Sequence, residues 1–146
     1  MSSKINGCDI PEDLYYSVEK HVWGKLGDDG IVTVGMTSVA QSLAGKLLYL
    51  TPKKVGQKIA QLKSVATVES GKYVGPVPAP FSGEITAVNE DAVKSVSLIN
   101  SDPYGKGWVC KIKPDNAEAD KKNLLTGKEA VEAYKKKIEA DGIKCE

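Results

Sequence analysis

Short β-forming stretches, each closed by glycine or proline, follow one another along most of this 146-residue chain. Strands are expected at residues 15–18, 22–26 and 31–36, and the pair Asp29 and Gly30 lies between the last two. An Asp-Gly pair flanked by β-forming residues is a strong hairpin signal. Many short strands punctuated by Gly and Pro are typical of a sandwich or a barrel. We therefore expect a mainly β fold, with two antiparallel sheets packed as a flattened barrel-sandwich hybrid.

A short helix is expected at residues 37–44. Thr37 or Ser38 can cap its start and Gly45 can end it, because both residue types are common at those positions. Further strands are expected at residues 46–50, 55–59, 63–69, 83–88 and 108–113, with rigid turns or loops at 76–83, 89–91 and 101–105.

The composition changes near residue 115, where Ala, Lys, Glu and Leu become frequent. One or two helices are expected between residues 117 and 140, with a break near Thr126 and Gly127, and the last residues, 141–146, are expected to fray. We expect one domain over residues 1–146, with a β body at about 11–114 and a helical extension at about 115–146. The apolar stripe that would hold the helices on the β body contains Leu124, Leu125, Val131, Tyr134 and Ile138.

Charge and motif content exclude several classes of protein. The 20 basic and 19 acidic residues give a net charge of +1, whereas a nucleic-acid binder usually needs a clustered basic face. The chain contains no apolar run of membrane-spanning length and no secretory signal at its start, so a cytoplasmic location is expected. One histidine and no Cys/His cluster argue against a metal site, and no catalytic motif is recognisable.

The segment Glu69-Ser70-Gly71-Lys72 lies between two β segments, which predicts a tight turn with Lys72 exposed at its tip. Gly71 would allow a positive φ in that turn without steric cost. A lysine at such a tip is most often a solubilising charge, and the turn alone favours that interpretation. It is also well placed to carry a covalent arm, since acylation of the ε-amine makes a long tether. A Schiff-base role would require a buried lysine, which an exposed turn does not supply.

Several collinear blocks make the chain resemble the H protein of the glycine cleavage system, a lipoyl carrier. The resemblance covers residues from about 11 to 114. It implies a lipoyl-domain-like fold, no catalytic residues of its own, and lipoate in amide linkage to Lys72. The matching blocks are His21-Val22-Trp23 (H-E-W), 32–37 with Ala40-Gln41 (VTVGIT…AQ), 68–72 (VESVK), 79–84 (APVSGE), Asn89-Glu90 (NE), 101–108 (SPYGxGW) and 111–114 (KIKP).

The departures from the family pattern concern the surroundings of the arm. The Glu of the H-E-W box is Val22, the small polar residue before the box is Lys20, and the acidic residue four positions after the lysine is Pro76. The histidine expected near the short helix falls at about Leu43. A cationic aminomethyl group should prefer nearby carboxylates, which these positions lack.

The stretch from Glu69 to Pro80 is similar to that of H-like lipoate-binding proteins that accompany heterodisulfide-reductase-like complexes in sulfur oxidation. This implies sulfur-bearing cargo, with that complex and dihydrolipoamide dehydrogenase as partners. The alternative is the glycine cleavage H protein itself, which shuttles an aminomethyl group between decarboxylase, aminomethyltransferase and dihydrolipoamide dehydrogenase. A third interpretation is an unmodified β domain that serves as an interaction module.

The resemblance also suggests roles for residues near Lys72. Glu69 and the neighbouring Ser70 and Gly71 are candidates for contact with the arm or with the lipoate-attaching enzyme, and Tyr73 and Val74 for partner recognition. His21 is expected to be structural, with contact to the arm and proton transfer near it as the alternative.

The three cysteines do not suggest a disulfide framework, because their number is odd and none are closely paired in the sequence. Cys110 is expected in the core. Cys8 and Cys145 are expected to be free thiols, with exchange against the lipoyl disulfide as the alternative.

Overall fold

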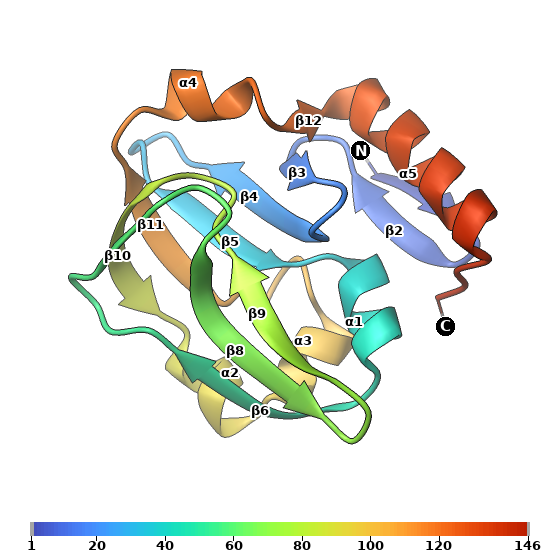
Figure 1. Ribbon diagram of the computed structural model, residues 1–146, viewed down its shortest axis with the longest axis horizontal. Helices are drawn as coiled ribbons and strands as arrows, with labels where there is room; N and C mark the ends of the chain where they lie inside the picture. Colours follow the sequence, from blue (N-terminus) through green and yellow to red (C-terminus); the bar gives the residue numbers. More distant parts are fainter. Residues whose placement is uncertain (1, 146) are drawn as a thin grey trace.

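The computed structural model describes residues 2–145 as three antiparallel sheets with five helices around them (Figure 1). The seven-stranded sheet has the order β12-β3-β4-β5-β11-β10-β7, and the three-stranded sheet has the order β6-β8-β9. The expected mainly β fold with antiparallel sheets is confirmed, and a small third sheet is added to it. The strands are β1 (Ser2–Ile5), β2 (Cys8–Pro11), β3 (Tyr15–Ser17), β4 (Val22–Leu26), β5 (Val32–Met36), β6 (Leu47–Pro52), β7 (Lys58–Ile59), β8 (Ser64–Ser70), β9 (Val74–Pro78), β10 (Gly83–Val88), β11 (Cys110–Pro114) and β12 (Leu125–Thr126).

The main core lies between the two larger sheets. Val34 and Ile112 of the seven-stranded sheet and Val65 and Val68 of the three-stranded sheet have no exposed surface and belong to one apolar cluster. Phe81, in the connection between β9 and β10, is also buried there. The alternating burial along β8 is the pattern expected of a strand with one face in the core and one in water.

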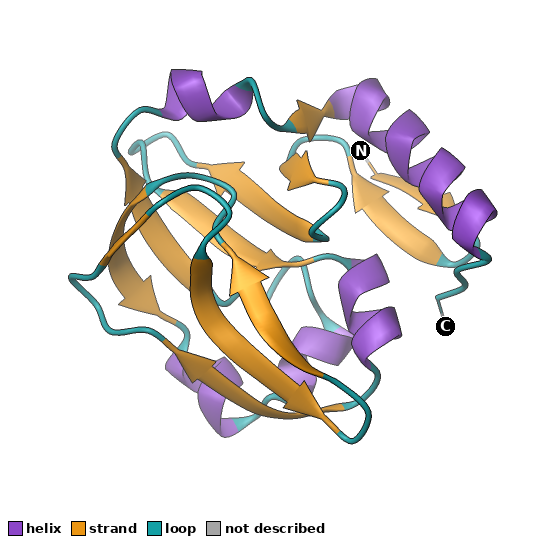
Figure 2. Cartoon of the chain, in the orientation of Figure 1, coloured by secondary structure: helices purple, strands orange, loops and turns teal. Residues whose placement is uncertain are grey.

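The helices lie around the strands (Figure 2). Thr37 caps the first helix, as expected, because its side chain accepts a hydrogen bond from the amide of Ala40, and Gly45 ends the helix with φ of 82°. The five helices are α1 (Ser38–Ala44), α2 (Glu90–Lys94), α3 (Ser97–Ser101), α4 (Ala117–Lys121) and α5 (Gly127–Asp141). No helix within residues 2–145 is long and apolar enough to cross a membrane.

A second core joins α5 to the N-terminal hairpin β1-β2 and to Trp23. The helix α5 buries Ala130, Tyr134 and Ile138, which are four residues apart and therefore share one face. The expected break near residue 126 is confirmed, because Thr126 pairs with Tyr15 in the sheet and α5 begins at the next residue.

The structure differs from the sequence predictions in the two short helices α2 and α3. The predicted turn at residues 89–91 is instead the start of α2, where the side chain of Asn89 accepts a hydrogen bond from the amide of Ala92. The predicted loop at 101–105 begins only after Ser101, which is the last residue of α3.

The proline-rich segment that was expected to be rigid and turn-rich begins with a strand. β9 contains Pro76 and Pro78 and pairs only with β8, because it lies at the edge of its sheet. An edge strand accepts proline, since the N–H groups on its open side have no ladder partner to lose.

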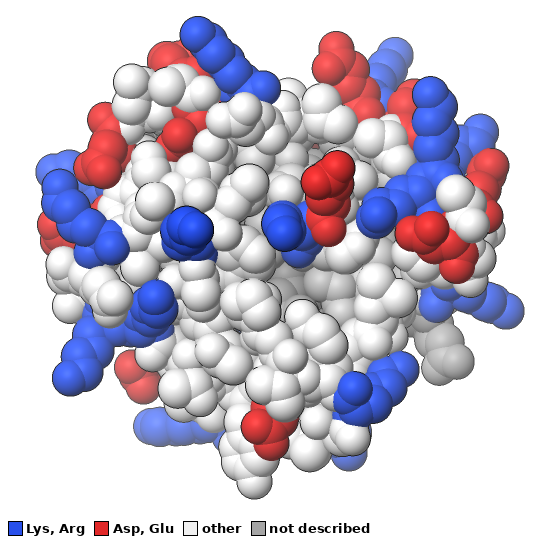
Figure 3. Space-filling model, viewed as in Figure 1, with Lys and Arg blue, Asp and Glu red and all other residues white. Residues whose placement is uncertain are grey.

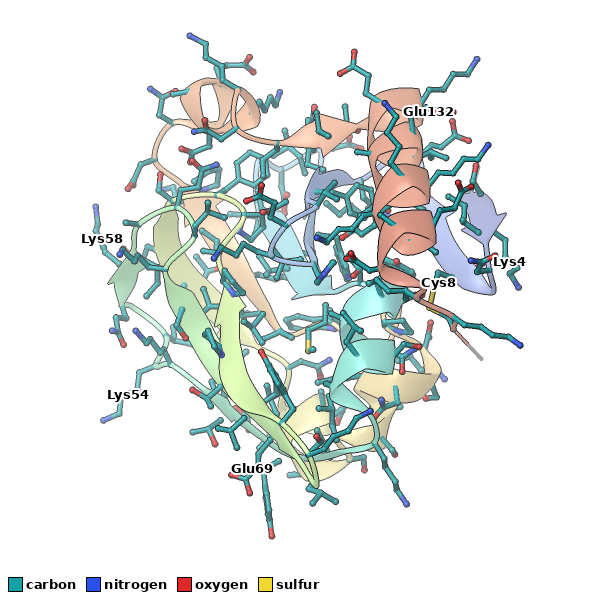
Figure 4. The ribbon with its side chains drawn as sticks, turned by 45° about the vertical axis from the view of Figure 1, so that its right-hand side comes forward. Lys4, Cys8, Lys54, Lys58, Glu69 and Glu132 are labelled. Atoms are coloured by element: carbon teal, nitrogen blue, oxygen red, sulfur yellow. A yellow bond between two sulfur atoms is a disulfide. The ribbon has the colours of Figure 1, made fainter. Side chains whose placement is uncertain are left out.

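The C-terminal residues 142–145 are packed rather than frayed. Ile143 is buried, and the amide of Cys145 donates a hydrogen bond to the carbonyl of Asn6 in the N-terminal hairpin. A disulfide between Cys8 and Cys145 joins the two ends of the chain, so the prediction of free thiols at these positions was wrong. Figure 4 shows Cys8 beside the C-terminal end of α5.

Candidate functional site

Lys72 lies at the tip of the hairpin formed by β8 and β9. The amide of Ser70 donates a hydrogen bond to the carbonyl of Tyr73 at 2.7 Å, which closes a tight turn with Gly71 and Lys72 at its centre. Both central residues are exposed. The turn geometry expected from the sequence is therefore present.

Gly71 does not adopt the positive φ that the sequence suggested, so the turn does not require glycine for that reason. A Cβ atom built on Gly71 would have no neighbour within 4 Å. The glycine instead leaves open space beside the lysine.

The hairpin tip is fastened to the end of α1 by a buried serine. Ser70 Oγ donates a hydrogen bond to the carbonyl of Ala44 at 2.5 Å and accepts one from the amide of Lys72 at 3.3 Å. The residue that precedes the turn is thus held by a helix on one side and holds the backbone of Lys72 on the other.

The aliphatic part of the Lys72 side chain lies against Gly45. A Cβ on Gly45 would lie 2.9 Å from Lys72 Cε and 3.7 Å from its Nζ, so a larger residue there would displace the lysine. Asn100 holds this platform, because its Nδ2 donates to the carbonyl of Gly45 at 2.9 Å and its Oδ1 accepts from the amide of Leu47 at 2.9 Å. Asn100 and Gly45 were not identified as site residues from the sequence, although Gly45 was recognised as the helix end.

A cavity of about 200 Å³ lies beside the hairpin, between β9 and α1. Figure 3 shows the molecule hollowed in this region, with a largely uncharged surface around it. Its wall is mostly apolar, and Tyr73 from the hairpin forms part of it. The lining residues are Lys20, His21, Val22, Met36, Ala40, Leu43, Ala44, Tyr73, Pro76, Val77 and Pro78.

The four positions at which the sequence departs from the family pattern meet in this cavity. Lys20, Val22, Leu43 and Pro76 come from three separate parts of the chain and all line it. No carboxylate occurs among the described residues that line the cavity. The substitutions therefore change one shared environment.

His21 also lines this cavity and is uncharged at neutral pH. Burial, with a smaller contribution from Lys137, lowers the pKa of His21 to about 4, although Asp141 acts in the opposite direction. Its ring stacks on Tyr134, with 5.9 Å between centroids, and its Nδ1 lies 3.3 Å from the Tyr134 hydroxyl oxygen. His21 therefore joins the cavity wall to α5, and its contact with the arm stays a prediction.

The other residues singled out near Lys72 face outward. Glu69 pairs with Tyr49 on one side and Val74 on the other, and all three are exposed. Figure 4 shows Glu69 pointing away from the body of the protein at the end of the hairpin. This row across the three-stranded sheet forms an outer surface next to Lys72 and does not enter the cavity.

The third cysteine is buried, as expected. Cys110 lies on β11 in the main core, and burial raises the pKa of its thiol to about 12. A protonated, inaccessible thiol is a poor nucleophile, so Cys110 takes no part in thiol chemistry at the hairpin.

The family model of the glycine cleavage H-protein matches residues 14–137. This range includes the seven-stranded sheet, the three-stranded sheet, the apolar cavity and the hairpin that carries Lys72. The chain belongs to the glycine cleavage H-protein family. H proteins are carriers rather than enzymes, and they hold lipoate covalently on a lysine.

Relatives and a solved structure support the same assignment. The chain is 48% identical to glycine cleavage system H protein 5 of Aquifex aeolicus, over 98% of this chain and 99% of that protein. It is 45% identical to probable glycine cleavage system H protein 2 of Saccharolobus solfataricus, over 96% and 95%. The crystal structure of an H protein from Mycobacterium marinum superposes with a TM-score of 0.74 at 35% identity, covering 85% of this chain and 98% of that one. Its match confirms the lipoyl-domain-like fold.

Proposed function

We propose that Lys72 carries the lipoyl group and that the hairpin β8-β9 presents it as a swinging arm. The observation that carries this proposal is the position of Lys72 in an exposed two-residue tip whose base is fastened by Ser70 to α1. The lipoyl group supplies a dithiolane that cycles between disulfide and dithiol. The protein supplies a rigid base, open space at Gly71 and an apolar cavity beside the arm.

The outer row of Tyr49, Glu69 and Val74 is proposed as the surface that partner enzymes contact. These side chains are exposed, and Glu69 and Val74 lie within three residues of Lys72 in the sequence. Exposed apolar side chains such as Tyr49 and Val74 are unfavourable in water, so their presence here favours contact with a partner protein. The lipoate-attaching enzyme is the first such partner, because it must reach Lys72. Tyr73, which is 42% exposed, joins this row to the cavity.

For the cargo, the comparisons support the aminomethyl group of the glycine cleavage system. The partners would then be the decarboxylase, the aminomethyltransferase and dihydrolipoamide dehydrogenase. This assignment rests on the family match and on relatives named as H proteins of that system.

A second cargo, a sulfur-bearing group delivered to a heterodisulfide-reductase-like complex, is favoured by the chemistry of the cavity. Lys20 is the one lysine and no Asp, Glu or Arg occurs among the described residues that line it, while burial keeps the pKa of His21 at about 4 and its ring neutral. An amine cargo would therefore meet no carboxylate there, while a neutral or anionic sulfur group would meet no repulsion.

We place the protein in the cytoplasm, where these partner enzymes would act. The disulfide between Cys8 and Cys145 is the observation against this location, because disulfides are rare in cytosolic proteins.

The attachment site is tested by intact mass and by mapping of the peptide spanning residues 63–84 in protein from the native host. A lipoyl mass on Lys72 is expected, and it should disappear in Lys72→Arg while Lys63→Arg keeps it. An unmodified Lys72 in a host that lipoylates other carriers would overturn the carrier proposal and favour an interaction module. Exchange of glycine with labelled bicarbonate, measured beside turnover of a sulfur substrate, then decides between the two cargoes.

A further inference from the structure

A second hollow lies on the other side of Gly45 from the apolar cavity. Its volume is about 580 Å³, against about 200 Å³ for the apolar cavity. Ala44 lines the apolar cavity and Gly45 lines the second hollow, so the end of α1 separates the two. The residues around this second hollow, called the polar hollow below, are Gln41, Ser42, Gly45, Lys46, Ser97, Asn100, Ser101 and Lys144.

The side chain of Lys72 is directed over the wall of the polar hollow. Its Cε lies 2.9 Å from the point where a Cβ on Gly45 would be, and its Nζ lies 3.7 Å from that point. Lys72 itself lines neither the apolar cavity nor the polar hollow, among the residues described around them. Because Gly45 lines the polar hollow and Lys72 lies against Gly45, an arm that continues from Nζ starts near the edge of the polar hollow.

The chemistry of the polar hollow suits an anion. Lys46 and Lys144 are exposed and bring two positive charges to its rim, and none of its described lining residues is acidic. The hydroxyl groups of Ser97 and Ser101 supply further hydrogen-bond donors. A cationic group would be repelled by this set, whereas a small oxyanion would find two charges and several donors.

Lys144 is held in place although it lies near the chain end. Ile143 before it donates its amide to the carbonyl of Ile138 at 3.0 Å. Cys145 after it is bonded to Cys8 and donates its amide to the carbonyl of Asn6 at 2.9 Å. The disulfide and the N-terminal hairpin thus fix the backbone position of Lys144, from which its side chain reaches the rim of the polar hollow.

We infer that the polar hollow is a docking site for an anionic end group carried on the arm of Lys72. The inference rests on the proposed attachment of the arm to Lys72 and goes beyond it by naming the charge of the cargo. Lys46 and Lys144 attract the anion, the hydroxyl groups of Ser97 and Ser101 donate hydrogen bonds to it, and Gly45 lets the lysine pass close to the wall.

Sulfite provides a defined probe on the lipoylated protein. It attacks one sulfur of the dithiolane, so the S–S bond of the ring breaks, a new S–S bond to sulfite forms, and the second arm sulfur leaves as a thiolate. No oxidant or reductant is needed. The arm then ends in a sulfonate, whose formation is followed by intact mass as the sulfite concentration is raised.

Backbone amide chemical shifts are recorded on the same samples. The expected result is that the adduct shifts the amides of Gly45, Ser101 and Lys144. The double variant Lys46→Gln/Lys144→Gln is expected to need about three- to tenfold more sulfite for half-formation, as two exposed charges would give. The matched control Lys94→Gln/Lys106→Gln removes two charges at another hollow on the surface. It should need the same sulfite concentration for half-formation of the adduct as the lipoylated wild-type protein.

Three results would overturn the inference. Equal adduct formation in Lys46→Gln/Lys144→Gln is one, and shifts confined to residues of the apolar cavity such as Met36 and Ala40 are another. Shifts at the polar hollow in Lys72→Arg, which cannot carry the arm, would show that free sulfite binds there without the arm. The mass of the same variant also reports any attack of sulfite on the Cys8–Cys145 disulfide. A missing lipoyl mass on Lys72 before sulfite is added would show that the proposed function itself had failed.

Discussion

Ser70 Oγ donates a hydrogen bond of 2.5 Å to the carbonyl of Ala44, which joins the hairpin tip to the end of α1. Ser70→Ala would leave a buried carbonyl without this donor, so we expect a loss of about 1–2 kcal/mol in unfolding free energy. Amide hydrogen exchange at Lys72 and Tyr73 should also become faster, because the tip loses its anchor. Urea denaturation and exchange measured by mass spectrometry check both effects.

Ser64→Ala is the matched control for that change. Ser64 lies on the same strand, and its Oγ donates to the carbonyl of Ala66 at 2.8 Å, but this bond does not reach α1. The control should lose stability without faster exchange at Lys72. Equal exchange at the tip in both variants would show that Ser70 does not anchor the hairpin.

The pH dependence of stability should contain a contribution from His21. Its pKa is about 4 in the folded protein, below the value of about 6.5 for an unperturbed histidine, so the folded state favours the neutral ring. The stabilisation is therefore complete above pH 6.5 and is lost as the pH falls toward 4. The urea concentration at the unfolding midpoint should therefore decline as the pH is lowered from about 6.5 to about 4, and change little from this cause between pH 7.5 and 6.5.

His21→Asn should flatten this part of the pH profile. His21 has φ of 57°, and Asn tolerates the left-handed region better than most residues, so the backbone is preserved. An NMR titration of the His21 ring gives an independent reading. A midpoint near 6.5 in the folded protein would contradict a partly buried ring that is held neutral.

The strands β3 to β8, β10 and β11 were predictable because each has a local signal, whereas β1, β2, β9 and β12 were not predicted. Glycine and proline mark the ends of most strands, and Thr37 and Gly45 mark the ends of α1. The signal failed where tertiary position overrides local preference. Pro76 and Pro78 indicated a turn, yet β9 keeps them because no strand within residues 2–145 pairs with its outer edge.

The candidate site was predictable at Lys72 and less so around it. The family pattern identified Lys20, Val22, Leu43 and Pro76 as unusual, but only the fold shows that all four line one cavity. The polar hollow depends on Lys144, whose position is set by residues of the N-terminal hairpin. Contacts across such a sequence separation leave no local pattern, and for this reason the chain end was expected to fray.

The absence of a carboxylate among the described residues that line the apolar cavity allows the cargo to be tested by mutation. Pro76→Asp would restore a carboxylate at an exposed edge position that lines the cavity, where it can attract a cationic aminomethyl group. We expect about a fivefold faster exchange of glycine with labelled bicarbonate in the presence of the glycine cleavage enzymes, as an interaction of about 1 kcal/mol would give. Thr86→Asp adds the same charge at an exposed position of β10 and should not change the rate. No gain with Pro76→Asp would mean that the missing carboxylate does not limit this reaction.

The disulfide should contribute strongly to stability, because Cys8 and Cys145 are 137 residues apart. Closing so long a loop restricts the unfolded chain and stabilises the folded state by about 5 kcal/mol in the chain-entropy description. Reductant should therefore lower the urea midpoint of the protein but not that of Cys8→Ser/Cys145→Ser, which should already be less stable. Thiol counting on unreduced, denatured protein checks the pairing directly. One reactive thiol per chain, from Cys110, is expected, and three would show that the bond is not formed.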